Sequence, residues 1–388
     1  AWAIAGLFAV CGALSYGALA RLFPESGGEY HFLRVTVHPF AGFLAGWVSL
    51  VAGFTVPIAI VALTFGAYVG PVLGEATSGE WIGTAAIALA ALMHGVALRF
   101  GLAIQNVAVA VKLLLIGGFI VLGAVRLPAF EPGEASSPDL PFDLGALAVA
   151  VVVISFSYSG WNAAVYIAGE IREPERNLRR ALLLGTGVVT IVYLALNAVF
   201  LWSAPPARLA GEVDIGAVAA LTLGGERLVL GVRGLVALAL LTSISAMVMA
   251  GPRVYARMAE DGLFPRWFRG TRDVPTGAVL FQAALAIAIV WLSELRALLD
   301  YAGFTLGISA AATVIGLLLH RLRHGPHRVP IPGFPLVPGI FVLGTLGAVA
   351  FVIASKPREA SLGLLTLAAG APVYAAIRFW RRRHAPMG

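Results

Sequence analysis

The sequence is poor in charge and has almost no cysteine. Asp, Glu, Lys and Arg make up 12% of its 388 residues, whereas a soluble domain carries roughly 25%. Most of the surface therefore faces something other than water, which excludes an ordinary soluble protein. Cys11 is the single cysteine, so a disulfide framework within the chain is excluded as well. The net charge of +7 does not indicate nucleic-acid binding, because the arginines stand beside apolar segments, as membrane topology requires.

Long apolar runs take the place of the missing charge. A membrane helix needs about 20 largely apolar residues to cross the hydrocarbon core. On this criterion we predict a single transmembrane domain, residues 1–388, with eleven spans. The spans cover residues 1–22, 40–69, 81–98, 103–125, 144–171, 181–203, 228–250, 276–292, 298–320, 336–353 and 362–380. Between them we expect an outer loop at 127–143 and a second at 205–226, with a short helix near 215–223.

The basic residues fall in alternate connections between these spans. Arginines concentrate at 172–180, 253–272, 321–328 and 378–383, which all lie on one side if every span crosses. The positive-inside rule makes that side cytoplasmic. We therefore predict a multi-pass protein of the cell (inner or plasma) membrane with a cytoplasmic C-terminus. The chain then starts outside, at Ala1 in an apolar run without an export signal, and one further upstream helix would give twelve spans.

The fifth span differs from the others because it is rich in small and polar residues. Glycine costs about 1 kcal/mol relative to alanine in a helix, and serine competes for backbone hydrogen bonds. A broken helix at membrane depth lines a protein cavity, where its freed N–H and C=O groups can bind the carboxylate and ammonium of an amino acid. The alternative is that small residues let two helices pack closely. The candidate substrate-binding residues are Ser155, Phe156, Ser157, Tyr158, Ser159, Gly160 and Asn162.

Lys112 is the second unusual feature, because it lies in the middle of the apolar run QNVAVAVKLLLIGGF. A charge at that depth costs several kcal/mol unless it is paired or reaches water, which favours a functional role over snorkelling to an interface. Hydroxyl groups in the seventh span are weaker candidates, since hydroxyls in membrane helices usually bond their own backbone. His94 is the only histidine well inside a span, and one histidine makes no metal site.

Several stretches, in order along nearly the whole chain, resemble one family. They are FPESGGEYHFL, QNVAVAVKLLLIG, FSYSGWN followed by GEIREPERNL, GPRVYARMAEDGLFP and RVPIPGFPLVPGIFV. The chain resembles the amino acid–polyamine–organocation superfamily, particularly bacterial permeases similar to the L-type amino acid transporters. The resemblance implies an all-α, LeuT-like fold of two inverted five-helix repeats with two extra helices. Residues 1–125 would then be helices 2–5 of the first repeat, 144–322 the second repeat, and 334–380 helices 11 and 12, with helix 1 missing.

The resemblance also implies roles for the residues of the fifth span. Residues 155–162 match the unwound segment of the family's sixth helix. Phe156 would be the aromatic gate over the substrate. Ser157, Ser159 and Gly160 would contact the α-amino group, and Asn162 would add a polar side-chain contact.

Coupling residues follow from the same resemblance. Lys112 matches a lysine that, in sodium-independent members, stands where sodium binds in sodium-coupled relatives. Thr242, Ser243 and Ser245 would lie where the family's eighth helix approaches that lysine. Glu170, Pro174 and Asn177 match a cytoplasmic motif that is more structural than functional.

We therefore predict a secondary active amino acid transporter that works by alternating access, as a sodium-independent exchanger or a proton-coupled symporter. Neutral substrates are favoured because we find no Asp or Glu deep inside a span; cationic amino acids, polyamines or another small amine are the alternative. A membrane-embedded enzyme and a channel are more distant alternatives, since His94 and Lys112 build no catalytic centre and one asymmetric break builds no pore. We expect no cofactor and no metal. No external cysteine lies near the family's fourth helix, so we also expect no ancillary subunit.

Overall fold

A computed structural model describes residues 1–73, 78–96, 98–126, 143–212, 214–270, 274–293 and 295–384 of the chain. The described residues form helices and connections, without a β-strand. The helices are α1 (Trp2–Leu22), α2 (Gly28–Thr36), α3 (Pro39–Val48), α4 (Val56–Leu73), α5 (Gly79–Val96), α6 (Leu98–Arg126), α7 (Leu144–Ser157), α8 (Pro174–Ser203), α9 (Pro206–Leu209), α10 (Ile215–Glu260), α11 (Thr276–Leu292), α12 (Leu295–His324), α13 (Leu336–Ser355) and α14 (Pro357–His384). A π-helical turn, η1 (Ser49–Thr55), joins α3 to α4, and two 3-10 helices are η3 (Ala163–Glu170) and η4 (Arg266–Phe268).

Within the described residues the eleven predicted spans fall on helices, apart from the break in the fifth, because an apolar run of this length satisfies its backbone hydrogen bonds only within itself. Eight helical stretches in the described part are long and apolar enough to cross a membrane, and α7 and α11 are shorter apolar helices. The prediction of an all-α multi-pass membrane protein is confirmed. The predicted outer loop at 127–143 lies outside the described residues except for Asp143, which caps the start of α7 through Gly145 N–H.

Three helices depart from simple spans. The 40–69 span is one continuous helical rod with the π-helical turn η1 in its middle, just before Pro57. The predicted short helix near 215–223 is confirmed as the first part of α10, which is interrupted at Gly225 (φ 69°, ψ −166°). We did not predict α2, and it is largely buried between the ends of the longer helices.

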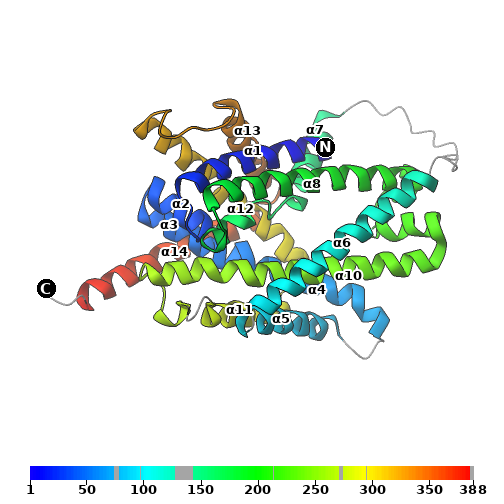
Figure 1. Ribbon diagram of the computed structural model, residues 1–388, viewed down its shortest axis with the longest axis horizontal. Coiled ribbons are helices and arrows are strands. Elements are labelled where there is room, and N and C mark those ends of the chain that lie inside the picture. The colour runs from blue at the N-terminus through cyan, green and yellow to red at the C-terminus, as the bar shows by residue number, and fades with distance from the viewer. Residues whose placement is uncertain are drawn as a thin grey trace.

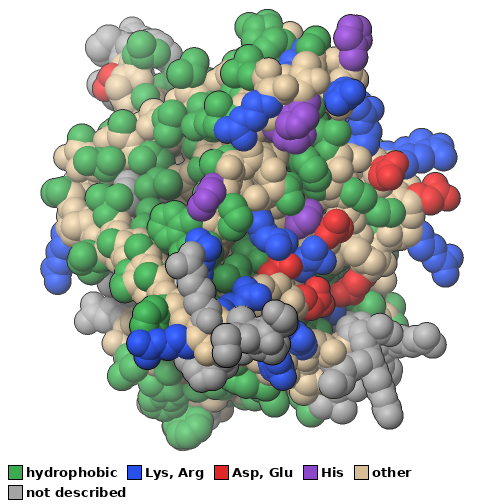
Figure 2. Space-filling view, turned by 90° about the vertical axis from the view of Figure 1, so that its left-hand side faces the viewer, with side chains coloured by type: hydrophobic (Ala, Val, Ile, Leu, Met, Phe, Trp, Pro, Cys, Tyr) green, Lys and Arg blue, Asp and Glu red, His purple; other side chains and the backbone are tan. Residues whose placement is uncertain are grey.

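α1, α8 and α10 run roughly along the long dimension of the molecule, and α6 runs obliquely to them (Figure 1). α1 packs chiefly against α8, α4 against α5 and α10, and α2 against α3 and α12. Charged side chains and histidines gather at one end of this bundle, which Figure 2 shows face on. That end holds the C-terminal end of α1, α2, and the C-terminal parts of α10 and α14, and we call it the charged end.

Candidate functional site

The helix of the fifth predicted span is broken, as the sequence pattern predicted. α7 ends at Ser157, turns occupy residues 158–162, and η3 continues from Ala163. Gly160 has φ +96°, a left-handed conformation that glycine adopts without the penalty that a side chain brings. Among the described residues, the N–H groups of Gly160 and Trp161 make no hydrogen bond. The break therefore leaves free donors at the level of an otherwise apolar helix.

The side chains around the break divide into two groups. Ser157, Ser159 and Gly160 are exposed in the structure, so they can reach a ligand. Tyr158 is buried: its ring lies 5.1 Å from that of Tyr193, and its hydroxyl donates to a backbone carbonyl of α1 at 3.2 Å. Of the predicted substrate-binding side chains, that of Tyr158 therefore belongs to the packing of α1 against α7 and α8.

Two further predicted residues stand at the start of the break. Ser155 donates to the Val151 carbonyl in its own helix, a bond that satisfies its hydroxyl locally. Phe156 is half-buried and packs against the main core, and its role as a gate stays a prediction.

Asn162, at the end of the break, lies against a buried carboxyl that we did not predict. Its amide Nδ2 donates to Glu29 Oε1 at 3.2 Å and lies 3.4 Å from the Tyr166 hydroxyl. Glu29 is 2% exposed and also accepts from the Tyr16 hydroxyl at 2.7 Å and from the Ser309 hydroxyl. Burial raises the pKa of this carboxyl, an effect that the three hydrogen bonds oppose in part.

Glu29 reaches this position because the segment before it docks onto η3. Ser26 Oγ accepts from Gly169 N–H at 2.8 Å, and Gly27 N–H donates to the Tyr166 carbonyl at 3.3 Å. Gly28, with φ +54°, lies so close to the Tyr166 ring that a Cβ there would overlap it. The glycine pair therefore lets the start of α2 approach η3 and turns Glu29 toward the break. A carboxylate directly after two glycines, followed by the apolar YHFL, was the signal available in the sequence.

Lys112 of α6 contacts α10. Its Nζ donates to Thr242 Oγ1 at 3.1 Å, and Gln105 Nε2 donates to the Thr242 carbonyl at 2.9 Å. The other two predicted coupling residues face elsewhere. Ser245 Oγ is 2.7 Å from His94 Nε2, and Ser243 bonds the carbonyl one turn earlier in its own helix. The structure thus brings Thr242 alone of the three hydroxyls to the lysine.

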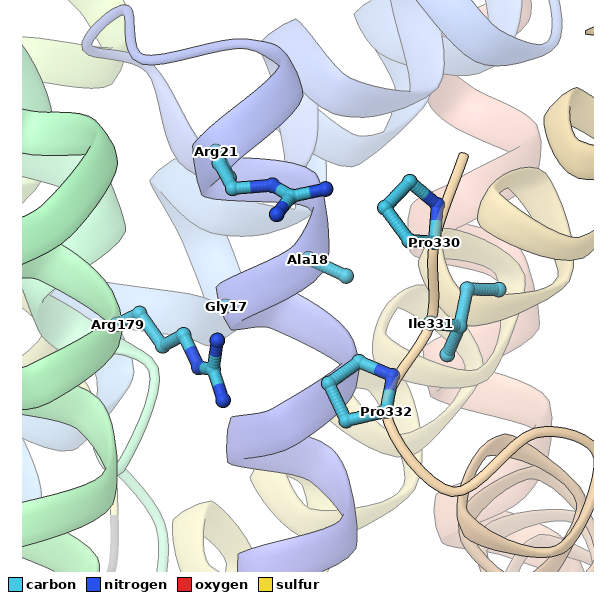
Figure 3. Close-up of a pocket in the computed structure, with 7 residues that line it drawn as sticks. All are labelled: Gly17, Ala18, Arg21, Arg179, Pro330, Ile331 and Pro332. Atoms are coloured by element: carbon cyan, nitrogen blue, oxygen red, sulfur yellow. The ribbon is translucent and has the colours of Figure 1, made fainter. Parts of the chain in front are cut away.

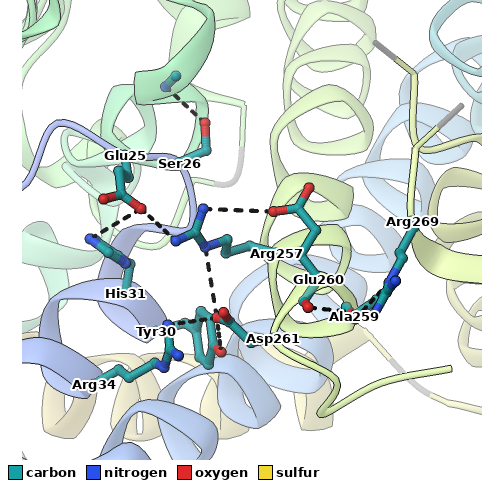
Figure 4. A network of polar contacts seen from close by, with 11 residues as sticks. Glu25, Ser26, Tyr30, His31, Arg34, Arg257, Ala259, Glu260, Asp261 and Arg269 are labelled. Atoms are coloured by element: carbon teal, nitrogen blue, oxygen red, sulfur yellow. Dashed lines mark hydrogen bonds and ion pairs between the residues drawn. The ribbon is translucent and has the colours of Figure 1, made fainter. Parts of the chain in front are cut away.

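A network of ion pairs joins α2 to the last turn of α10 at the charged end (Figure 4). Asp261 accepts from the Tyr30 hydroxyl at 2.5 Å and pairs with Arg34 at 2.9 Å. Arg257 pairs with Glu25 and lies 3.7 Å from Asp261. These bonds tie α2 and the segment before it to the end of α10.

A separate ion pair joins η3 to α10. Arg253, which is 5% exposed, donates through Nε to Glu170 at 2.8 Å and through Nη1 to the Met249 carbonyl at 2.5 Å. Glu170, Pro174 and Asn177 were predicted to be structural. Asn177 donates to the Arg172 carbonyl at 2.6 Å, and Pro174 begins α8.

A cavity of about 220 Å³ lies away from the break. It is lined by Gly17, Ala18 and Arg21 of α1, Arg179 of α8 and the 330–332 stretch (Figure 3). None of the predicted substrate-binding or coupling residues lines it, so it is not the predicted site.

Comparisons with known proteins match nearly the whole chain. A family model described as "Amino acid permease" matches residues 1–371. Human "Large neutral amino acids transporter small subunit 2" is 28% identical over 401 residues, covering 98% of this chain and 74% of that protein. Mouse "Asc-type amino acid transporter 1" is 26% identical over 400 residues, with the same coverage. Human "b(0,+)-type amino acid transporter 1" is 26% identical over 373 residues, covering 92% of this chain and 75% of that protein.

The first of these names calls its protein a small subunit, so the comparisons do not support our expectation that the chain has no ancillary subunit. The resemblance of the chain to the amino acid–polyamine–organocation superfamily is confirmed. All three relatives are named as amino acid transporters, and the all-α fold agrees with that family. This chain belongs to the amino acid permease family, within the amino acid–polyamine–organocation superfamily.

Proposed function

We propose that the chain is a sodium-independent carrier of neutral amino acids that binds its substrate at the break between α7 and η3. The observation that supports this most is the break itself. Free N–H groups at Gly160 and Trp161 can donate to a carboxylate, and the exposed hydroxyls of Ser157 and Ser159 can bind an ammonium. An amino acid zwitterion supplies both partners within one small molecule.

Sodium independence is proposed because the amino group of Lys112 donates to Thr242 Oγ1 at 3.1 Å. A sodium ion needs oxygen ligands and is repelled by a cation at hydrogen-bonding distance from those ligands. Thr242 Oγ1 itself donates to the Ala239 carbonyl at 2.8 Å while it accepts from Lys112. Both bonding directions of this hydroxyl are thus in use.

Neutral substrates are proposed because no Asp or Glu lies deep inside a predicted span. Glu29, between the first two predicted spans, nevertheless places one carboxyl group against Asn162. However, Glu29 already accepts three hydrogen bonds from protein donors and is buried, so the cationic side chain of a substrate would have to displace them. That cost favours substrates without a second positive charge.

Alternating access is proposed through motion of the helices that meet at the break, with the charged end facing the cytoplasm. Positive charge gathers at that end together with the C-terminal helix, in keeping with the positive-inside rule (Figure 2). The division into two inverted repeats, residues 1–125 and 144–322, also remains a proposal.

The test is uptake of a panel of radiolabelled amino acids into liposomes that contain the purified protein. Uptake is measured with and without sodium, with and without a pH gradient, and with and without amino acid inside. We expect saturable uptake of neutral amino acids that sodium does not change. Uptake of only arginine, lysine or polyamines would contradict the substrate class, and a strict requirement for sodium would contradict the role of Lys112.

Variants locate the site in the same assay. Asn162→Ala should abolish uptake, because it removes the polar side chain at the end of the break. Asn197→Ala is the matched control, since that amide donates to the Tyr193 carbonyl within its own helix. Equal uptake by wild type and Asn162→Ala would place the substrate elsewhere.

A further inference from the structure

Three hydrogen-bond donors from three separate segments converge on Glu29. Tyr16 belongs to α1, Asn162 to the break and Ser309 to α12, whereas Glu29 itself begins α2. α1 packs on α8, and α2 packs on α3 and α12. The carboxyl is therefore a junction between helices that must move relative to each other if access to the break alternates.

The carboxyl is buried without a cation. Among the described residues, no Lys, Arg or His forms an ion pair with Glu29. The titratable groups that face it among the described residues are two phenols, Tyr16 from α1 and Tyr166 from η3, and α12 contributes the hydroxyl of Ser309. The next titratable groups on α2, Tyr30 and His31, turn toward the Glu25–Arg257–Asp261 network instead (Figure 4). A buried charge without a counter-ion is costly, so a proton is the simplest way to neutralise it.

We propose that Glu29 is the proton-binding residue of this transporter and that its protonation state controls the closure of the charged end beneath the break. This inference rests on the proposed transport function. Of the two predicted coupling modes, amino acid exchange and proton symport, it favours proton symport. As a carboxylate, Glu29 holds α1, Asn162 and α12 together through charge-assisted bonds, which are roughly twice as strong as neutral ones. After one carboxylate oxygen takes a proton from water on one side, these bonds weaken and the helices separate more easily.

The link to the substrate is Asn162. Its Nδ2 group donates to Glu29 Oε1, and the same side chain stands at the end of the proposed substrate site. Protonation of Oε1 makes it a weaker acceptor for that N–H, which is then more easily drawn to a bound amino acid. Because coupling between two binding events is reciprocal, substrate that engages Asn162 favours protonation of Glu29 to the same degree. The raised pKa of the buried carboxyl supports this exchange, since it moves protonation toward the pH range of a cell.

The decisive experiment follows amino acid and protons together in liposomes that contain the full chain and a trapped pH-sensitive dye. In wild type we expect amino acid uptake to acidify the interior, and the rate of uptake to fall as the pH rises. In Glu29→Gln we expect the acidification to be lost and the pH dependence of uptake to flatten, while exchange of internal for external amino acid continues. Acidification by Glu29→Gln equal to that of wild type would overturn the proposal.

Two milder variants test the same proposal if Glu29→Gln does not fold. Ser309→Ala and Tyr16→Phe each remove one donor to the carboxylate, so each should move the midpoint of the pH profile upward by about half to one unit. Ser15→Ala is the matched control, because this buried hydroxyl bonds the Cys11 carbonyl in its own helix. A purely structural role would lower the yield of folded protein and leave the midpoint in place, which would overturn the assignment.

Failure of this inference can be told from failure of the proposed function. A folded wild-type protein that carries no amino acid under any gradient contradicts the transport function and this inference with it. Sodium-independent uptake with an unchanged proton response in all three variants overturns only the assignment of Glu29.

Discussion

The ammonium of Lys112 in α6 lies 3.1 Å from the hydroxyl of Thr242 in α10. The two residues are far apart in the sequence, and each lies in the middle of an apolar helix. A lysine at such a depth needs a polar partner, because its charge is costly in an apolar surrounding. The contact therefore ties α6 to α10 through a charged group that the sequence alone marked as unusual.

Replacing Lys112 by Met should lower the rate of amino acid uptake roughly tenfold or more, because a hydrogen bond to a charged group contributes about 1.5–3 kcal/mol. Thr242→Val, which keeps the charge and removes the acceptor, should have a smaller effect in the same direction. The measurement is the initial rate of amino acid uptake into liposomes that contain each variant. Lys356→Met, at the chain's other lysine, is the matched control. Full activity of Lys112→Met would show that the charge has no part in transport.

Replacing Glu170 by Ala should lower the free energy of unfolding by about 1–3 kcal/mol, because it leaves the buried guanidinium of Arg253 without its carboxylate. The loss stays moderate since Glu170 is partly exposed and water can replace it. The measurement is thermal unfolding in detergent. Glu226→Ala, at an exposed position, should leave the transition unchanged. An Arg253→Met/Glu170→Ala double variant as unstable as the sum of the single ones would contradict a direct pairing.

Replacing Gly28 by Ala should destabilise the protein by about 1–3 kcal/mol, because the added Cβ overlaps the Tyr166 ring and the left-handed backbone disfavours a side chain. Gly187→Ala is the matched control, since this glycine lies in α8 with no neighbour within 4 Å of an added Cβ. Alanine should be tolerated there or slightly stabilising. Equal unfolding temperatures for the two variants would mean that α2 does not depend on this close approach.

The stability of the protein should fall between pH 7.5 and 5.5, in part because of His31. Burial lowers the pKa of this imidazole, against the smaller opposing effect of Glu25, and neither ring nitrogen has a hydrogen-bond partner. The unfolded chain therefore binds a proton near the ordinary pKa of about 6.5, where the folded chain does not. Stability that is present above that pH is lost as the pH falls below it.

His31→Phe should remove part of that loss, as measured by unfolding temperatures at the two pH values. His327→Phe, at an exposed position after α12, is the control and should leave the loss unchanged. If His31→Phe loses as much stability on acidification as wild type, His31 does not carry the effect.

The membrane spans and the break were predictable because both depend on local sequence. An apolar run of about 20 residues forms a helix in a membrane whatever surrounds it, since no other structure satisfies its backbone there. Gly160 with its neighbouring serines weakens a helix for equally local reasons. The depth of Lys112 follows from its place in one such run. These features needed no knowledge of the neighbouring helices.

The position of Glu29 was decided only by the tertiary structure. The stretch 23–36 has the composition of a connection, and the burial of α2 depends on α1, η3 and α12 closing around it. The same holds for the partners of the hydroxyls in α10, where Thr242 faces Lys112 and Ser245 faces His94. Sequence by itself determined which segments enter the membrane and where one of them breaks, because backbone hydrogen bonding and hydropathy are properties of each segment. Which polar groups meet inside was set by the packing of helices distant in sequence, because a side chain's hydrogen-bond partner depends on what the fold brings within about 3 Å of it.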